Sequence, residues 1–201
     1  MKLENIPGED EAWAKLATLD PAKVCRRTSA GFDEPTEIYT LKSYGCDISI
    51  SPSDQRIFSS SPRGEELLGK VDASLTLLWY LASLHSLPLS GKLVKPGSLP
   101  GGQIFEKGTH VLPLEPLAEK YAQAPEAFIE TGKMWGGEDL DYGDAAIQLW
   151  PLPQVPTTLI LRTADEEFPA LVNLVLDSSC KFQLPTDIIW ALCMMSALIM
   201  W

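Results

Sequence analysis

The sequence contains few residues of the types that most often mark a catalytic or metal-binding protein. Its 201 residues include two histidines and four cysteines. The cysteines, Cys25, Cys46, Cys180 and Cys193, are far apart, with no C-x-x-C pair and no nearby histidine of matching spacing. Structural zinc and iron-sulfur clusters normally depend on such spacing. The sequence therefore predicts no metal site, and we expect free thiols in a reducing cytoplasm.

Motifs of common catalytic sites are also missing. No G-x-S-x-G elbow of a serine hydrolase and no G-x-G-x-x-G nucleotide fingerprint occurs. The segment after Gly102 contains Lys107-Gly108-Thr109, in which lysine and glycine stand in the reverse of their P-loop order. No catalytic residue is assigned from sequence.

Positive charge is scarce as well. The sequence contains 16 lysines and arginines and 27 aspartates and glutamates, so its formal net charge is −11. Such a balance repels a phosphate backbone, and nucleic acid is not an expected partner. The first residues include Glu4, Glu9 and Asp10 where a signal peptide has a basic region followed by an apolar one, so none is predicted.

The residues that are present suffice for one folded domain. Hydrophobic residues make up 45% of the chain and charged residues 21%, a composition typical of globular proteins. A chain of 201 residues can bury a sizeable core. We expect a single soluble domain spanning residues 1–201.

Two apolar helices are predicted. In the segment 71–87, Val71, Leu75, Leu78 and Ala82 recur at helical spacing and most of the circumference is apolar, which indicates a buried central helix. Residues 188–201 would form a helix about 21 Å long, shorter than the ~30 Å apolar core of a bilayer. We interpret it as a terminal helix buried against a sheet, with membrane anchorage and dimerisation through an exposed apolar face as alternatives.

Strand patterns lie on either side of the central helix. Glu37–Leu41 and Cys46–Ser51 alternate at a period of two and predict an early hairpin. A late meander is predicted from three further runs: Ala145–Trp150, Thr157–Arg162 and Leu171–Leu176. The last run is apolar on both faces, which favours the interior of a sheet. The predicted fold class is α+β, with a mainly antiparallel sheet packed on the central and C-terminal helices.

Weaker helical patterns complete the prediction. One covers Asp10–Leu19, another is entered within Leu112–Leu117 with Pro116 in its first turn, and a third spans Tyr121–Thr131, contains Pro125 and ends at Gly132. The proline-rich segment 151–156 is expected to separate two strands of the meander.

The stretch 95–117 concentrates glycine and proline. Pro96-Gly97 and Pro100-Gly101-Gly102 predict two successive tight turns, which allow the backbone to approach another surface closely. This suits a ligand loop, and equally a connection that only reverses direction. We expect the stretch to fold over the 71–87 helix, so that any site lies along their seam.

Acidic segments supply the other candidates. Between Met134 and Asp144, carboxylates crowd a loop, but an EF-hand starting at Asp139 would need glycine in place of Asp144. We interpret it as an acidic surface loop over Trp135. Burial of a carboxylate of Asp165–Glu167 against Phe168 could raise its pKa enough for acid-base work, whereas a solvated turn is the structural alternative. The candidate ligand-binding residues are Gly101, Gly102, Phe105, His110, Trp135, Asp144, Asp165 and Glu167.

Several short motifs together resemble a known family. They are Leu78-Trp79-Tyr80-Leu81, Leu99-Pro100-Gly101-Gly102 with Phe105, Pro113-Leu114, Gly143-Asp144-Ala145 and Glu167-Phe168-Pro169-Ala170. The sequence resembles domain-of-unknown-function family 3786, a group of bacterial and archaeal proteins of roughly 200 residues, many from anaerobes. The resemblance implies no activity. Some relatives carry iron-sulfur cysteine motifs or occur alongside corrinoid proteins, but this chain lacks those cysteines.

Three functional hypotheses follow. The first is a non-catalytic accessory module that binds a small ligand or a partner protein in an apolar groove. The second is a small enzyme that uses His110 with Asp144 or with Asp165–Glu167. The third, implied by the resemblance alone, is service to a corrinoid or iron-sulfur enzyme system. No cofactor is assigned, and a partner protein or a second copy could bind through the C-terminal helix.

Overall fold

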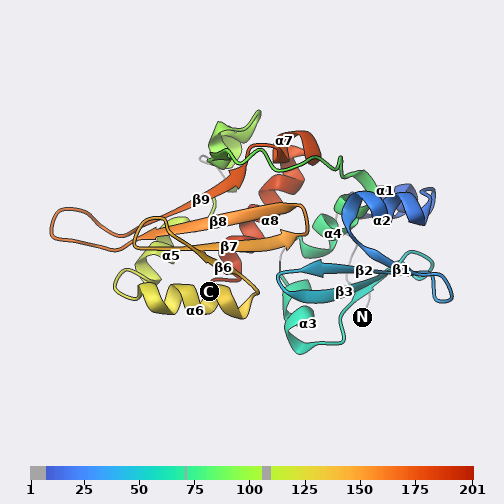
Figure 1. Ribbon diagram of the computed structural model, residues 1–201, viewed down its shortest axis with the longest axis horizontal. Coiled ribbons are helices and arrows are strands. Elements are labelled where there is room, and N and C mark those ends of the chain that lie inside the picture. Colours follow the sequence, from blue (N-terminus) through green and yellow to red (C-terminus); the bar gives the residue numbers. More distant parts are fainter. Residues whose placement is uncertain (1–7, 71, 106–109) are drawn as a thin grey trace.

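Two separate antiparallel sheets form the framework of the protein (Figure 1). The computed structural model describes residues 8–70, 72–105 and 110–201. The smaller sheet has the order β1-β2-β3-β4, with β1 Gly31–Asp33, β2 Ile38–Ser43, β3 Cys46–Ser51 and β4 Arg56–Phe58. The larger has the order β5-β9-β8-β7-β6, with β5 Leu93–Val94, β6 Glu138–Leu140, β7 Ala145–Leu152, β8 Val155–Arg162 and β9 Leu171–Asp177. The predicted α+β class is confirmed, with hairpin and meander in different sheets.

Eight α-helices and two short 3₁₀ turns accompany the sheets in the described ranges. The helices are α1 Glu9–Ala17, α2 Pro21–Thr28, α3 Pro62–Leu68, α4 Ala73–Ser83, α5 Leu114–Lys120, α6 Pro125–Met134, α7 Cys180–Gln183 and α8 Thr186–Leu198, and the 3₁₀ turns are η1 Pro96–Ser98 and η2 Gly102–Phe105. Figure 1 shows the larger sheet at one end of the long axis, the smaller at the other, and α4 and α8 in the middle. None of the helices in these ranges has the length and apolar content needed to span a bilayer.

The central helix is α4, as predicted. Leu77, Leu78 and Leu81 are fully buried, and α4 packs against α1, α2, α3 and α8. The predicted start at Val71 lies outside the described residues. The helix ends at Ser83, four residues before the predicted end, and the Arg27 guanidinium donates a hydrogen bond to the Leu81 carbonyl. Because the last carbonyls of a helix have no partner within it, this bond stabilises the end.

The small sheet docks on the rest of the protein through the tip of its β2–β3 hairpin. Tyr44 and Gly45 have φ of 46° and 73°, the positive values that a two-residue primed turn needs. The Tyr44 side chain is 0% exposed, and its hydroxyl lies 2.7 Å from the Ser196 hydroxyl on α8. Its amide donates to the Trp150 carbonyl at 2.8 Å. The tip therefore joins the small sheet to both β7 and α8.

The apolar C-terminal helix lies in the core, as we interpreted it. Ile188, Leu192 and Met195 on α8 are buried, and the helix packs against α4 and β7. Its polar Ser196 bonds to Thr157 on β8 at 2.9 Å and to the Leu192 carbonyl at 2.8 Å, so this hydroxyl is satisfied inside the core. Dimerisation through this helix stays a prediction.

The helix predicted over Tyr121–Thr131 was wrong in its bounds. Tyr121 ends α5, and a new helix, α6, begins at Pro125. Proline favours the first helical turn because it has no amide hydrogen to bond, so Pro125 starts a helix here. Gly132 does not end α6, which continues to Met134. A Cβ at this position would lie 2.3 Å from Ile147 Cγ1. The glycine lets α6 pack closely on β7.

The proline-rich segment 151–156 was predicted to separate two strands over its whole length, but it separates them only at 153–154. β7 continues to Leu152 and β8 starts at Val155, so the turn between them is short. The strand register shifts between Leu149 and Leu152, an irregularity of the kind at which prolines are tolerated in sheets. Pro151 takes part in docking, since its carbonyl accepts a hydrogen bond from Ser43 Oγ at 2.7 Å.

Asp177, at the end of β9, holds the segment that leads into β5. Its carboxylate accepts hydrogen bonds from the Ser90 amide at 2.9 Å, the Gly91 amide at 2.8 Å and the Ser179 hydroxyl at 2.6 Å. Burial would raise the pKa of Asp177, but the hydrogen bonds from Ser179 and Ser90 outweigh it and lower the pKa to about 2. The charged form is therefore stabilised in the folded protein.

Replacing Asp177 with asparagine should lower the free energy of unfolding by about 2 kcal/mol at neutral pH. The folded pKa lies below the unfolded value of 3.8, so the stabilisation is complete above about pH 4 and is lost as pH falls towards 2. Urea denaturation between pH 2 and 7 measures this. The control is Asp141→Asn, at an exposed position. If the unfolding free energy of Asp177→Asn changed with pH in parallel with that of the native protein over pH 2–4, the lowered pKa of Asp177 would be contradicted.

Candidate functional site

An apolar groove of about 1010 Å³ lies between α5, β9 and the segment 95–105. Phe105, Leu112 and Leu114 line one part of it, and Val172 and Leu174 on β9 line another. Figure 1 shows the η1–η2 segment beside β9, at the outer edge of the larger sheet. The groove therefore combines a helix, a strand and the glycine-proline stretch in one site.

The Pro-Gly-Gly sequence shapes the wall formed by residues 95–105. Gly101 follows Pro100 with φ of 75°, which a proline-glycine turn of type II requires. At Gly102 a Cβ would lie 2.1 Å from the Pro96 carbonyl oxygen, so only glycine allows η2 to fold back on η1. This folding brings Phe105, which is 4% exposed, to the groove.

The position of this bend was predicted wrongly. It does not cover α4, and instead packs on β9 and the start of α8, where Thr186 Oγ1 donates to the Pro100 carbonyl at 3.4 Å. The surface of α4 is already occupied by α1, α2, α3 and α8. The seam that we predicted along α4 therefore lies along β9.

The wall opposite the bend is α5. Leu117 and Ala118 are buried, whereas Glu115 and Glu119 are exposed at the rim of the groove. Immediately after the helix, the Tyr121 hydroxyl donates to the Met200 carbonyl at 2.6 Å. This bond anchors α5 to the segment that follows α8, so the wall is fixed to the core.

Along one side of the groove runs a strand edge that we had predicted to lie inside a sheet. β9 pairs with β8 from Leu171 to Leu176, but β5 pairs only with Leu176 and Asp177. Pro96 follows β5 almost at once, and proline has no amide hydrogen with which to continue a ladder. Among the described residues, 171–175 therefore form an edge, contrary to the prediction for Leu171–Leu176.

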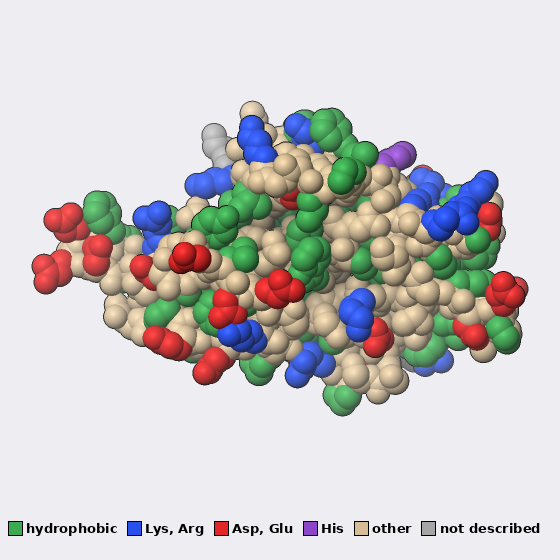
Figure 2. All heavy atoms as spheres, viewed as in Figure 1, with side chains coloured by type: hydrophobic (Ala, Val, Ile, Leu, Met, Phe, Trp, Pro, Cys, Tyr) green, Lys and Arg blue, Asp and Glu red, His purple; other side chains and the backbone are tan. Residues whose placement is uncertain are grey.

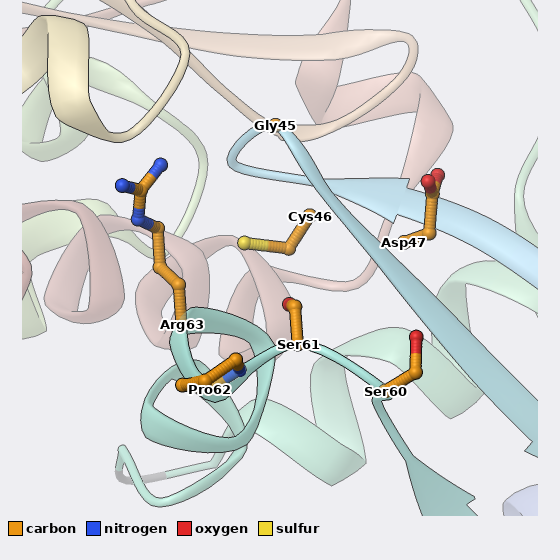
Figure 3. A pocket seen from close by; sticks show the side chains of 7 residues that line it. All are labelled: Gly45, Cys46, Asp47, Ser60, Ser61, Pro62 and Arg63. Carbon is orange, nitrogen blue, oxygen red and sulfur yellow. The ribbon is translucent and has the colours of Figure 1, made fainter.

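A second hollow, of about 500 Å³, lies between the β2–β3 tip and α3 (Figure 3). Figure 3 shows the Cys46 thiol pointing into it, with the Arg63 side chain on the opposite side. Burial raises the pKa of Cys46, although the charge of Arg63 acts in the other direction. A nucleophilic cysteine needs a lowered pKa, so this thiol is not activated.

Two other polar groups of this second hollow, Ser61 and Asp47, have structural partners. Ser61 Oγ accepts a hydrogen bond from the Gly64 amide at 3.0 Å and caps α3, and Asp47 pairs with Lys42 at 2.9 Å. The groove along β9 has twice the volume and a more continuous apolar lining, so we regard it as the candidate site.

Four of the eight predicted site residues form the bend or adjoin it at the groove. Phe105 lines it, and Gly101 and Gly102 form the bend that carries Phe105. His110 is exposed next to the lining residue Val111, its ring stacks edge-on against Trp190 at 5.1 Å, and its carbonyl accepts a hydrogen bond from Trp190 Nε1 at 2.7 Å.

Of the other four predicted residues, Trp135 and Asp144 lie elsewhere, whereas Asp165 and Glu167 lie in the loop between the groove-lining residues Ala164 and Pro169. Trp135 is buried against Tyr44, at a ring distance of 6.4 Å. Asp144 is exposed, and hydrogen bonds from the amide and hydroxyl of Thr163 lower its pKa. Asp165 Oδ1 accepts hydrogen bonds from the amides of Glu167, at 2.9 Å, and Phe168, at 2.7 Å.

Asp165 and Glu167 belong to the exposed loop between β8 and β9. Figure 2 shows acidic side chains gathered at the end of the molecule where Figure 1 draws this loop. Phe168 is 66% exposed, so it does not bury the neighbouring carboxylates as the acid-base hypothesis requires. The proposed cooperation of His110 with Asp144 or with this loop stays a prediction.

Reasoning from sequence missed the most prominent part of the site, the edge of β9 with Val172 and Leu174. The available signal was Pro96, which stands two residues after the last paired residue of β5 and prevents that strand from extending. Lys95, Glu115 and Glu119, the charged groups of the rim, were also not predicted.

The cysteines do not form the donor set of a cluster. Cys25 lies on α2, Cys46 on β3, Cys180 on α7 and Cys193 on α8. Within the described ranges, no group of three or more His, Cys, Asp or Glu side chains is arranged to hold a metal ion. Burial raises the pKa of Cys180 to about 11, which keeps this thiol protonated at neutral pH. The residues present therefore do not fit an iron-sulfur centre.

These features define an α+β protein with two antiparallel sheets and an apolar groove at a strand edge. The chain belongs to the family described as Domain of unknown function (DUF3786), whose model matches residues 20–198. This confirms the resemblance seen in the sequence motifs, and the match extends from the helix α2 to the end of α8. No curated protein and no solved structure matches the chain.

Proposed function

We propose that the protein is a non-catalytic binding module that holds an apolar ligand in the groove between α5, β9 and the segment 95–105. The observation that carries this proposal is the volume of about 1010 Å³ together with the mainly apolar lining. Ligand sites in proteins are typically concave, hundreds of Å³ in volume and apolar, with a few polar groups that orient the ligand. In this groove Lys95, Glu115, Glu119 and Asn173 are such groups.

The chemistry of the lining supports binding over catalysis. The described lining residues include no histidine or cysteine, and the titratable side chains among them, Lys95, Glu115 and Glu119, are exposed at the rim. Catalytic acids and bases are usually partly buried next to a group that tunes their pKa. The four cysteines lie as free thiols, which supports a cytoplasmic location.

Filling the groove tests the proposal. Ala170 lines it and is only half-buried, so the indole of an Ala170→Trp variant would occupy the groove without displacing a packed side chain. We expect the native protein to bind one molecule of the fluorescent probe 1-anilinonaphthalene-8-sulfonate, and the variant to bind it at least about tenfold more weakly. Fluorescence titration measures both affinities.

The matched control is Ala22→Trp, at an exposed position on α2. It adds the same side chain outside the groove and should leave probe binding unchanged. Both variants should keep the thermal midpoint of the native protein, since neither replaces a buried residue. Probe binding by Ala170→Trp with native affinity would overturn the proposal.

A further inference from the structure

The edge of β9 differs from the other strand edges in the described part of the chain. Natural sheets protect their edges with short strands, charges or prolines, because an open edge pairs with other chains. β1 and β4 have three residues each and contain Asp33 and Arg56, and β6 contains Glu138 and Asp139. Residues 171–175 of β9 carry neither charge nor proline.

The backbone of this edge turns two sets of hydrogen-bonding groups towards the groove. The Ser178 amide donates to the Lys92 carbonyl at 2.8 Å, and Leu176 is paired with Val94 in the same ladder. Successive residues of a strand direct their backbone groups to opposite sides. The amides and carbonyls of Val172 and Leu174 therefore point to the side of β5, beyond the place where β5 has ended.

Charges of both signs surround the groove. Lys95 stands at the end near β5, Glu115 lies in the first turn of α5, and Arg162 is paired with Leu171 at the end of β8. At the other end the Ala164 amide donates to the Ala122 carbonyl at 3.2 Å, which places the end of α5, with Glu119 one turn earlier, beside the base of the β8–β9 loop. The acidic residues Asp165–Glu167 follow in that loop. The end of the groove at the β8–β9 loop thus carries more acidic than basic side chains, and the end near β5 carries Lys95.

We infer that the ligand is an extended peptide that adds a strand to the open edge of β9, antiparallel to it, with apolar side chains at every second position and basic residues at its C-terminal end. This inference rests on the proposed function of the groove. An apolar small molecule fills volume but cannot bond to the backbone groups of Val172 and Leu174, whereas an added strand bonds to both. Antiparallel to β9, the peptide starts near Lys95 and ends near Glu119 and the acidic loop, which matches the order of charges.

The probe for the test is an acetylated nonapeptide that alternates valine with serine and ends in Lys-Arg. We expect saturable binding in isothermal titration calorimetry and displacement of anilinonaphthalene sulfonate from the groove. A second peptide has the same side chains but is N-methylated at the backbone amides that would face β9. It should bind at least about tenfold more weakly, since it cannot donate to the Val172 and Leu174 carbonyls. A third, with Lys-Arg moved to the N-terminus, should bind several-fold more weakly at low salt and equally at high salt.

The outcomes separate this inference from the proposed function. If the sulfonate probe binds but the nonapeptide does not, the groove holds small molecules and the strand inference is overturned alone. If neither binds, both proposals fail. Equal affinity for the N-methylated peptide would overturn strand addition, because side chains alone would then account for binding. Sedimentation showing a dimer that the nonapeptide does not dissociate would overturn it too, by making a second copy the occupant of the edge.

Discussion

Replacing Tyr44 with alanine is expected to lower the free energy of unfolding by about 3–5 kcal/mol. The ring is 0% exposed at the tip of the β2–β3 hairpin, and its removal leaves a cavity between β7, α8 and the small sheet. Alanine would also retain the positive φ of 46°, so no backbone strain is relieved in return. Denaturation by guanidinium chloride, followed by tryptophan fluorescence, measures the loss.

The control is Tyr44→Phe, which keeps the ring and removes the hydroxyl. Ser196 would still bond to Thr157 and to the Leu192 carbonyl, so the expected loss is only about 1 kcal/mol. If the alanine variant lost no more than the phenylalanine variant, the tip would not be the link between the sheets that the structure indicates.

Gly132→Val should destabilise the protein by about 3 kcal/mol. In an exposed helix a larger residue in place of glycine usually stabilises, because glycine has the greater freedom in the unfolded chain. At Gly132 we expect a loss of stability instead of a gain, since a Cβ on α6 would lie 2.3 Å from Ile147 Cγ1 on β7. Helix and sheet would have to separate, or Ile147 would have to leave its buried position.

Two further variants check this explanation. Glu130→Ala changes an exposed position of the same helix and should alter the free energy of unfolding by less than about 0.5 kcal/mol. The double variant Gly132→Val with Ile147→Ala should lose less unfolding free energy than the two single variants lose in sum, because the shorter side chain at 147 makes room for the valine. Additive losses in urea denaturation would argue against a direct clash.

Periodicity in the sequence was sufficient to predict the main elements. The apolar pattern of 71–87 predicted α4, and alternation predicted the hairpin and the meander, since these patterns depend only on neighbours along the chain. The bounds of α5 and α6 and the continuation of strands through 151–156 were missed. Each depended on packing, as between Gly132 and Ile147, that local patterns do not contain.

The site was predictable only in part for the same reason. Glycine and proline identified the bend that carries Phe105, because backbone-special residues act locally. The surface that the bend covers depends on which helices already occupy α4, and the open edge of β9 depends on Pro96 stopping a strand far away in sequence. Trp135 and Asp144 were chosen for residue type, but Trp135 packs against Tyr44 and Asp144 bonds to Thr163, away from the groove.

The docking of Tyr44 also affects how long its side chain stays exposed while the protein is being synthesised. The early hairpin can form soon after it leaves the ribosome, since its strands are joined by a tight turn. Tyr44 and its partner Ser196 are 152 positions apart in the chain. A nascent chain therefore carries an incompletely covered aromatic ring at the hairpin tip until α8 has emerged, and chaperones that recognise exposed aromatic side chains can bind it during that interval.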